Sequence, residues 1–68
     1  MPNKNISISQ KQSLQRQLDR SGAGTEQNIA MMIQVLDNAG DAHNSLKLKQ
    51  ALLSFRVVYN RARLKLQS

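Results

Sequence analysis

The chain has 68 residues, no cysteine and a formal net charge of +6, with ten lysines and arginines against four acidic residues. A domain of this length buries only about 60% of the surface that it exposes when unfolded, so we expect it to be marginally stable alone. The lack of cysteine excludes disulfides and thiolate metal sites, which leaves oligomerisation as the usual way to stabilise so small a domain.

The N-terminal segment, residues 1–8, is polar apart from two isoleucines and is expected to be flexible. A single helical domain is predicted over residues 9–68. Its first helix covers about residues 9–21, with Ser7 or Ser9 as the N-cap in the Ser-x-x-Gln pattern of a capping box. The two glycines that follow are expected to end this helix, because glycine is unfavourable inside a helix and common just after one.

The second predicted helix covers about residues 25–39 and is apolar around much of its circumference. Thr25 is its expected N-cap, and Gly40 is expected to end it in the left-handed conformation. Its apolar residues recur at the i, i+3, i+4, i+7 spacing of a core-facing helix, so we expect it to be central in its domain or in a dimer. These residues are Ile29, Met32, Ile33 and Leu36.

The third predicted helix, about residues 42–66, has apolar residues on two opposite sides. Asp41 is its expected cap, with Asn44 and Ser45 as alternatives. The first stripe has the spacing of either a coiled-coil seam between two copies or ordinary packing within the chain. The second stripe needs another cover, most simply a second copy. The first stripe is Leu48, Leu52, Phe55, Tyr59, Ala62 and Leu66, and the second is Leu46, Leu53, Val57 and Leu64.

These elements predict an all-α, three-helix subunit with a long C-terminal helix that forms a homodimer through this helix, with the second helix as a further candidate for the interface. The expected interface residues are Leu46, Leu53, Val57, Leu64, Leu48, Leu52, Phe55 and Tyr59.

Positive charge is concentrated at the two ends of the chain. Residues 1–22 carry a net +3, residues 23–45 a net −3, and residues 46–68 a net +6 without any acidic residue. This distribution favours binding to a polyanion or to an acidic protein surface. We therefore expect a small, basic, non-enzymatic regulatory protein that binds nucleic acid mainly through phosphate contacts. The expected binding residues are Lys47, Lys49, Arg56, Arg61, Arg63, Lys65, Arg16 and Arg20, with those of the third helix in two seams between its stripes.

A second class of function fits the same features. The chain is then an adaptor, an inhibitor or a chaperone-like cofactor for a larger protein. The spare apolar side of the third helix would dock in a groove of that partner, and the flanking basic residues would face an acidic rim.

A third possibility comes from the alternation of polar and apolar residues over residues 4–9, followed by a short helix, a glycine-containing turn and an apolar helix. In this order the segment at about residues 4–38 resembles the ribbon-helix-helix repressors, whose paired N-terminal strands enter the major groove. The resemblance implies that Asn5, Ser7 and Ser9 face the bases. The chain departs from that family in its uncharged groove-facing positions and in a first helix with few apolar residues.

Catalysis, cofactors and membranes have little support in the sequence. His43, the single histidine, has no second ligand or nucleophile nearby and is expected to be exposed and without a role. We expect no metal, cofactor or small-molecule substrate. The longest apolar run, residues 29–33, is far shorter than the roughly 20 residues of a membrane span. With no secretory signal at the N-terminus, the expected location is the cytoplasm.

Overall fold

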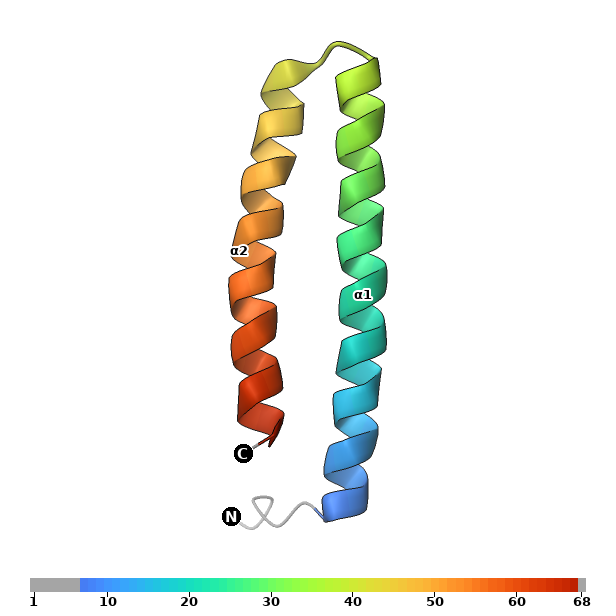
Figure 1. Ribbon diagram of the computed structural model, residues 1–68, viewed down its shortest axis with the longest axis vertical. Coiled ribbons are helices and arrows are strands. Elements are labelled where there is room, and N and C mark those ends of the chain that lie inside the picture. Colours follow the sequence, from blue (N-terminus) through green and yellow to red (C-terminus); the bar gives the residue numbers. More distant parts are fainter. Residues whose placement is uncertain (1–6, 68) are drawn as a thin grey trace.

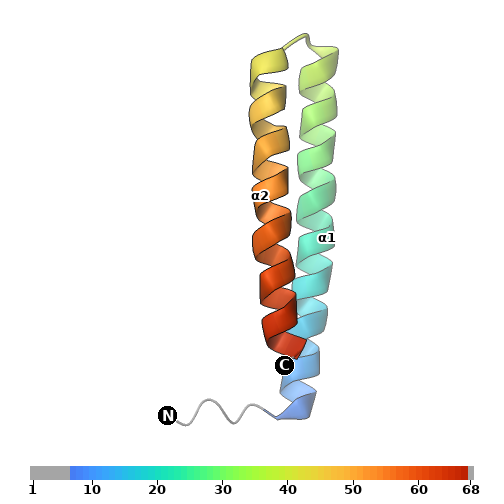
Figure 2. The ribbon, with the colours of Figure 1, turned by 60° about the vertical axis from the view of Figure 1, so that its left-hand side comes forward.

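The computed structural model describes residues 7–67, which form two helices packed as an antiparallel hairpin (Figure 1). Helix α1 spans Ile8–Asn38 and helix α2 spans Ala42–Gln67. Turned by 60°, the two helices still lie side by side over the length of α2 (Figure 2). The start of α1 and the end of α2 therefore lie at one end of a rod, and the turn lies at the other. The fold is all-helical, as predicted.

The N-terminus of α1 is fixed by a reciprocal cap. The Ser7 hydroxyl accepts a hydrogen bond from the backbone N–H of Gln10 at 3.1 Å, and the Gln10 side chain accepts one from the backbone N–H of Ser7 at 3.2 Å. This is the predicted capping box, and Ser7, not Ser9, makes it. Ile8, which was assigned to the flexible segment, is the first residue of α1. Residues 1–6 of that segment lie outside the described part of the chain.

The predicted break between the first two helices does not occur, so the described chain has two helices and not three. Gly22 and Gly24 both lie inside α1. Thr25, the expected N-cap, instead donates its hydroxyl hydrogen bond back to the carbonyl of Ser21 at 2.8 Å, as a residue within a helix does. A glycine inside a helix costs about 1 kcal/mol relative to alanine, which is small enough for packing against a second helix to offset.

The turn between the helices is made as predicted. Gly40 has φ = 79°, the left-handed conformation that glycine adopts without strain. The Gly40 N–H bonds the carbonyl of Asp37 at 3.1 Å and the Asp41 N–H bonds that of Leu36 at 2.9 Å, which is a Schellman motif. Asp41 then caps α2 through its carboxylate, which accepts from the Asn44 N–H at 3.2 Å. The start of α2 at Ala42 confirms the expected boundary.

The seam between the helices has a thin core. Leu52 is the one large apolar side chain that is buried among the described residues. The radius of gyration is 16.0 Å, against about 11 Å for a compact domain of this length. The hairpin is therefore a rod with little interior. Its seam contains Leu18, Gly22, Ile29, Ile33 and Leu36 from α1 and the first stripe, Leu48, Leu52, Phe55, Tyr59, Ala62 and Leu66, from α2.

Candidate interaction surfaces

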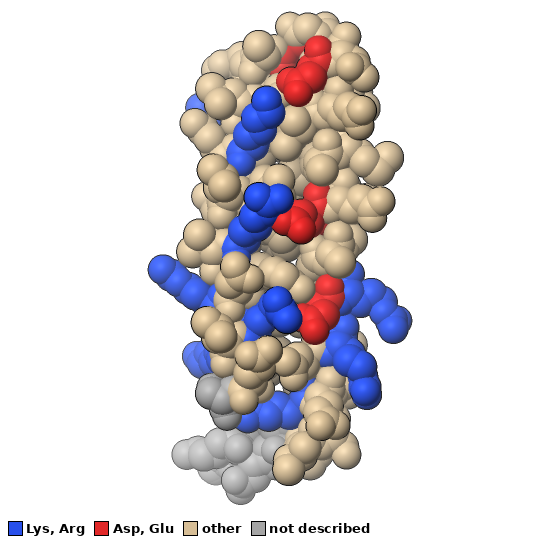
Figure 3. All heavy atoms as spheres, viewed as in Figure 1, with Lys and Arg blue, Asp and Glu red and all other residues tan. Residues whose placement is uncertain are grey.

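One long side of the hairpin carries a row of three ion pairs between the helices (Figure 3). Each joins an acidic residue of α1 to a basic residue of α2, and in every pair both side chains are about half exposed. Exposed pairs of this kind contribute less than about 1 kcal/mol each, so their main effect is to favour one register of the two helices. We call this the ion-pair side, defined by Asp19–Arg63, Glu26–Arg56 and Asp37–Lys49.

The ion-pair side ends, toward the termini, in a polar and aromatic cluster around Tyr59. The Tyr59 hydroxyl lies 3.3 Å from a carboxylate oxygen of Asp19 and donates to it. Arg63 lies 2.9 Å from the same carboxylate, as a charge contact without hydrogen-bond alignment, and its guanidinium is 5.7 Å from the Tyr59 ring centroid. Desolvation of Tyr59 and the Asp19 charge raise the pKa of its hydroxyl above the ordinary value.

Gly22 makes this cluster possible. A Cβ atom at position 22 would lie 2.1 Å from Cε1 of Tyr59, inside van der Waals contact. One edge of the Tyr59 ring therefore lies in the space that a side chain at position 22 would occupy, and Phe55 stacks on this ring with ring centroids 5.5 Å apart. No side chain other than hydrogen fits at position 22 with the ring in this place.

The opposite long side of the hairpin is apolar. Counting about 100° per residue, Met32 lies roughly 120° around α1 from Glu26, and Val58 lies roughly 160° around α2 from Arg56. Met32 is 47% exposed and Val58 is 63% exposed. We call this the apolar side and define it by Leu14, Leu18, Met32 and Leu36 of α1 and Leu48, Ala51, Phe55 and Val58 of α2.

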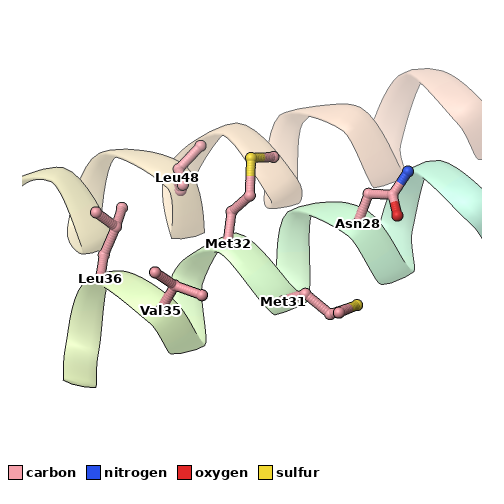
Figure 4. A pocket seen from close by; sticks show the side chains of 6 residues that line it. All are labelled: Asn28, Met31, Met32, Val35, Leu36 and Leu48. Carbon is pink, nitrogen blue, oxygen red and sulfur yellow. The ribbon is translucent and has the colours of Figure 1, made fainter. Parts of the chain in front are cut away.

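Near the turn, the apolar side is hollowed into an open groove of about 670 Å³ (Figure 4). Met32 points from α1 toward Leu48 of α2, while Met31 points away along α1. Methionine side chains adapt their shape to an apolar partner, which suits a surface that another helix covers. The groove is lined by Asn28, Met31, Met32, Val35, Leu36 and Leu48.

The second stripe of α2 forms a separate apolar surface, which faces away from α1. Its exposed fractions run from 51% at Val57 to 65% at Leu64. Folding of the hairpin leaves this stripe uncovered, because α1 covers only the first stripe. We call it the outer stripe, consisting of Leu46, Leu53, Val57 and Leu64.

Charge divides the hairpin along its length. The half near the turn, residues 24–56, has three basic and three acidic residues and no net charge. The half near the termini, residues 8–23 and 57–67, has six basic residues and one acidic residue, for a net +5. We call these the loop half and the terminal half. The hairpin brings the basic first part of α1 and the basic last part of α2 together, and Figure 3 shows basic side chains projecting on both edges of the terminal half.

The structure separates the expected binding residues into different surroundings. Of the eight expected nucleic-acid contacts, Lys49, Arg56 and Arg63 lie in interhelical ion pairs. The other five, Lys47, Arg61, Lys65, Arg16 and Arg20, are exposed.

Of the eight expected interface residues, four lie in the hairpin's own seam and the other four form the outer stripe. The expected interface residues in the seam are Leu48, Leu52, Phe55 and Tyr59.

Sequence reasoning did not select Gly22, Met32 or Val58 as functional residues. A signal existed for Gly22, which lies seven residues before Ile29 and so in line with the seam of α1. The same helical count places Met32 and Val58 on the sides of their helices that adjoin the seam.

Three further observations concern metal sites, the single histidine and membranes. Residues 7–67 contain no group of three or more His, Cys, Asp or Glu side chains placed to hold a metal ion. His43 is exposed in the first turn of α2. Neither helix within this range is long and apolar enough to cross a membrane.

Over residues 7–38, the structure has neither the strand nor the turn that the resemblance to ribbon-helix-helix repressors implies. Ser7 and Ser9 belong to the cap and first turn of α1 and not to a strand, and the helix runs through the expected turn. Asn5 lies outside the described residues. Comparison with known proteins adds no relative, since no protein family, curated protein or solved structure matches this chain.

Proposed function

We propose that the protein is a non-enzymatic helical adaptor, which associates with itself and docks the outer stripe of α2 on a larger protein. The observation that carries the proposal is the exposure of four aliphatic side chains in one row on α2, each more than half exposed. An apolar row of this length on a helix is the surface that groove-binding helices use, with anchors three, four and seven residues apart.

The partner's surface is acidic. Arg61 lies four residues after Val57 and three before Leu64, so it borders the outer stripe. Among the described residues, no acidic side chain of α1 pairs with it. Lys49 and Arg56 border it on the other side, from within their ion pairs. A groove with an acidic rim would meet these residues at both edges, which favours fast and selective association.

The adaptor proposal is tested first by site-specific photo-crosslinking in the cells that make the protein. A photo-reactive residue at Val57 should capture one protein repeatedly, whereas the same residue at Gln34, an exposed position on α1, should not. Equal capture from both positions would count against a docking role for the outer stripe.

Binding is then measured with the purified captured protein. Leu53→Glu should weaken binding at least about tenfold by calorimetry, because a charge would enter an apolar groove. Gln34→Glu also adds one negative charge, but on α1 and outside the outer stripe, so it should leave the affinity unchanged. An unchanged affinity for Leu53→Glu would overturn the proposed site.

Nucleic-acid binding is a second candidate, favoured by the net +5 of the terminal half. Arg16, Arg20 and Arg61 project from this half and have no ion pair among the described residues. Phosphate contacts from such side chains would be strongly salt-dependent. Acidic residues compete with phosphate for two of the three basic residues of the loop half, Lys49 and Arg56, and for one of the six in the terminal half, Arg63. The terminal half is therefore the better surface for a polyanion.

This second candidate is tested by fluorescence anisotropy with duplex and single-stranded oligonucleotides at several salt concentrations. Replacing Arg16, Arg20 and Arg61 with glutamine should reduce the slope of log K against log salt by roughly 2.7 for duplex DNA. Replacing Lys47, Lys49 and Arg56 removes the same charge from the loop half and should change the slope less. Equal effects of the two triple variants, or no binding at low salt, would exclude a terminal-half site.

A further inference from the structure

The apolar side of the hairpin requires a cover that is as long as the hairpin itself. It runs from Leu14 in the terminal half, past Val58 near the middle of the rod, to Leu36 and Leu48 near the turn. Between residues 12 and 36, the face of α1 that contributes to it carries no charged side chain. A local peptide would cover only the groove near the turn, whereas a second rod covers the whole side.

The chain exposes more surface than a compact monomer of its mass, and the excess is large enough for an interface of the size that a dimer provides. Its exposed surface is 5430 Å², whereas a folded monomer of 7.6 kDa exposes about 4,300 Å². The difference, roughly 1,100 Å², exceeds the approximately 800 Å² that each partner buries in a standard interface. One buried large apolar side chain among the described residues is also few for a stable isolated domain.

We infer that the apolar side packs against the apolar side of a second copy, with the two hairpins antiparallel, to form a four-helix bundle. The inference rests on the self-association proposed above, and it names the surface and the orientation. A two-fold axis near Thr25, the midpoint of this side along α1, would place the groove of each copy against the Leu14 and Leu18 end of the other. Val58, which lies between the levels of Gly22 and Glu26, would then lie close to the axis. The ion-pair sides would then both face solvent.

The distribution of charge along the hairpin favours the antiparallel arrangement of the two copies. Hairpins aligned in the same direction would bring two terminal halves together, each with a net +5. In the antiparallel arrangement each terminal half adjoins a loop half, which has no net charge and contains Glu26, Asp37 and Asp41. The outer stripe stays exposed in this dimer, so self-association and docking on a larger protein use different surfaces.

Two neighbouring valines separate this interface from the one predicted from the sequence. Val58 belongs to the apolar side and Val57 to the outer stripe, and both are more than half exposed in the hairpin. By light scattering, Val58→Glu should be monomeric at concentrations where the parent protein is a dimer, and Val57→Glu should remain dimeric. Circular dichroism of both variants checks that they stay helical. A dimer broken by Val57→Glu and kept by Val58→Glu would overturn the proposed surface.

The orientation is measured by electron spin resonance between labels on the cysteine-free chain. A label at Gln12→Cys, an exposed position off the apolar side, lies 13 residues from Thr25, so antiparallel copies should place two labels about 40 Å apart. A distance below about 25 Å in a dimer would overturn the orientation alone. A parent protein that remains a folded monomer would overturn both this inference and the proposed self-association.

Discussion

The loop half and the terminal half of the hairpin are closed by different kinds of contact. At the turn, Gly40 and Asp41 close the chain through backbone geometry and a helix cap, within a few residues of sequence. In the terminal half, Gly22 and Tyr59 close it through an aromatic ring that takes the space of the missing side chain, between residues far apart in the chain. The comparison teaches that one short hairpin combines a local closure, which any similar sequence would make, with a non-local closure that depends on one pair of residues.

The largest effect should come from Gly22 inside α1, and the neighbouring Gly24 should respond with the opposite sign. Gly22→Ala should lower the free energy of unfolding by about 1–3 kcal/mol, since the new Cβ would displace the Tyr59 ring. Gly24→Ala meets nothing within 4 Å and should raise it by about 0.5–1 kcal/mol. Urea unfolding at one protein concentration measures both.

A control identifies the ring as the cause. In a Tyr59→Ala background, Gly22→Ala should become stabilising, because the space at position 22 is then open and alanine favours the helix. If Gly22→Ala were destabilising in both backgrounds, contact with Tyr59 would not be the reason for the glycine.

The turn should respond next. Gly40→Ala forces a side chain into the left-handed conformation and should cost about 1–2 kcal/mol. Asp41→Ala removes the cap of α2 and should cost about 1 kcal/mol. Thermal unfolding followed by circular dichroism measures both, and Asp41→Asn, which can still cap, should cost much less. A cost as large for Asn as for Ala would mean that the charge of Asp41 matters more than the cap.

The ion pairs should matter less than either closure. Arg56→Gln removes the pair with Glu26 and should cost less than about 1 kcal/mol, with the loss shrinking in high salt. Arg61→Gln removes the same charge from an exposed position of α2 outside the row of ion pairs, and should change stability by no more than about 0.5 kcal/mol. Urea midpoints at low and high salt compare the two variants, and a salt-independent loss for Arg56→Gln would contradict an electrostatic origin.

The smallest effect should be the pH dependence from Tyr59. Its pKa in the folded chain is raised above the value of 10.0 in the unfolded chain. Its contribution to stability is therefore complete below about pH 10 and decreases as the pH rises through the raised pKa. Tyr59→Phe should lose stability less steeply between pH 9 and roughly pH 11 than the parent in urea titrations, since both proteins share all lysines. Identical slopes would exclude Tyr59 as the titrating group.

The two closures also explain how much of this fold could be predicted. The capping box at Ser7, the left-handed Gly40 and the Asp41 cap are local patterns. Gly40 was predicted correctly, Ser7 was predicted with Ser9 as an alternative, and Asp41 with Asn44 and Ser45 as alternatives. The break at Gly22 was wrong because a glycine inside a helix and a glycine after one look alike locally. Gly22 is needed because the Tyr59 ring lies against it. Tyr59 is far from Gly22 in the sequence, so the residues beside Gly22 do not indicate this contact.

The candidate surfaces were predictable to a similar extent. The periodicity of α2 identified both of its stripes, and it left open which of them would face the chain's own helix. The position of α1 determines which stripe is buried, because α1 packs on the first stripe and leaves the outer stripe exposed. The ion pairs between the helices could not be predicted either, because they depend on the register of α1 against α2, and the sequence predicted three helices. These pairs are Asp19–Arg63 and Glu26–Arg56.

The start of α1 and the end of α2 lie at one end of the rod, and this position has a mechanical consequence. Tension applied between the N-terminal end of α1 and the C-terminal end of α2 acts across the seam and not along it. The contacts would then separate one helical turn after another, from Leu66 through Tyr59 to the turn at Gly40. A hairpin pulled in this way opens like a zipper under a small force, whereas the same seam pulled lengthwise would have to shear all its contacts at once.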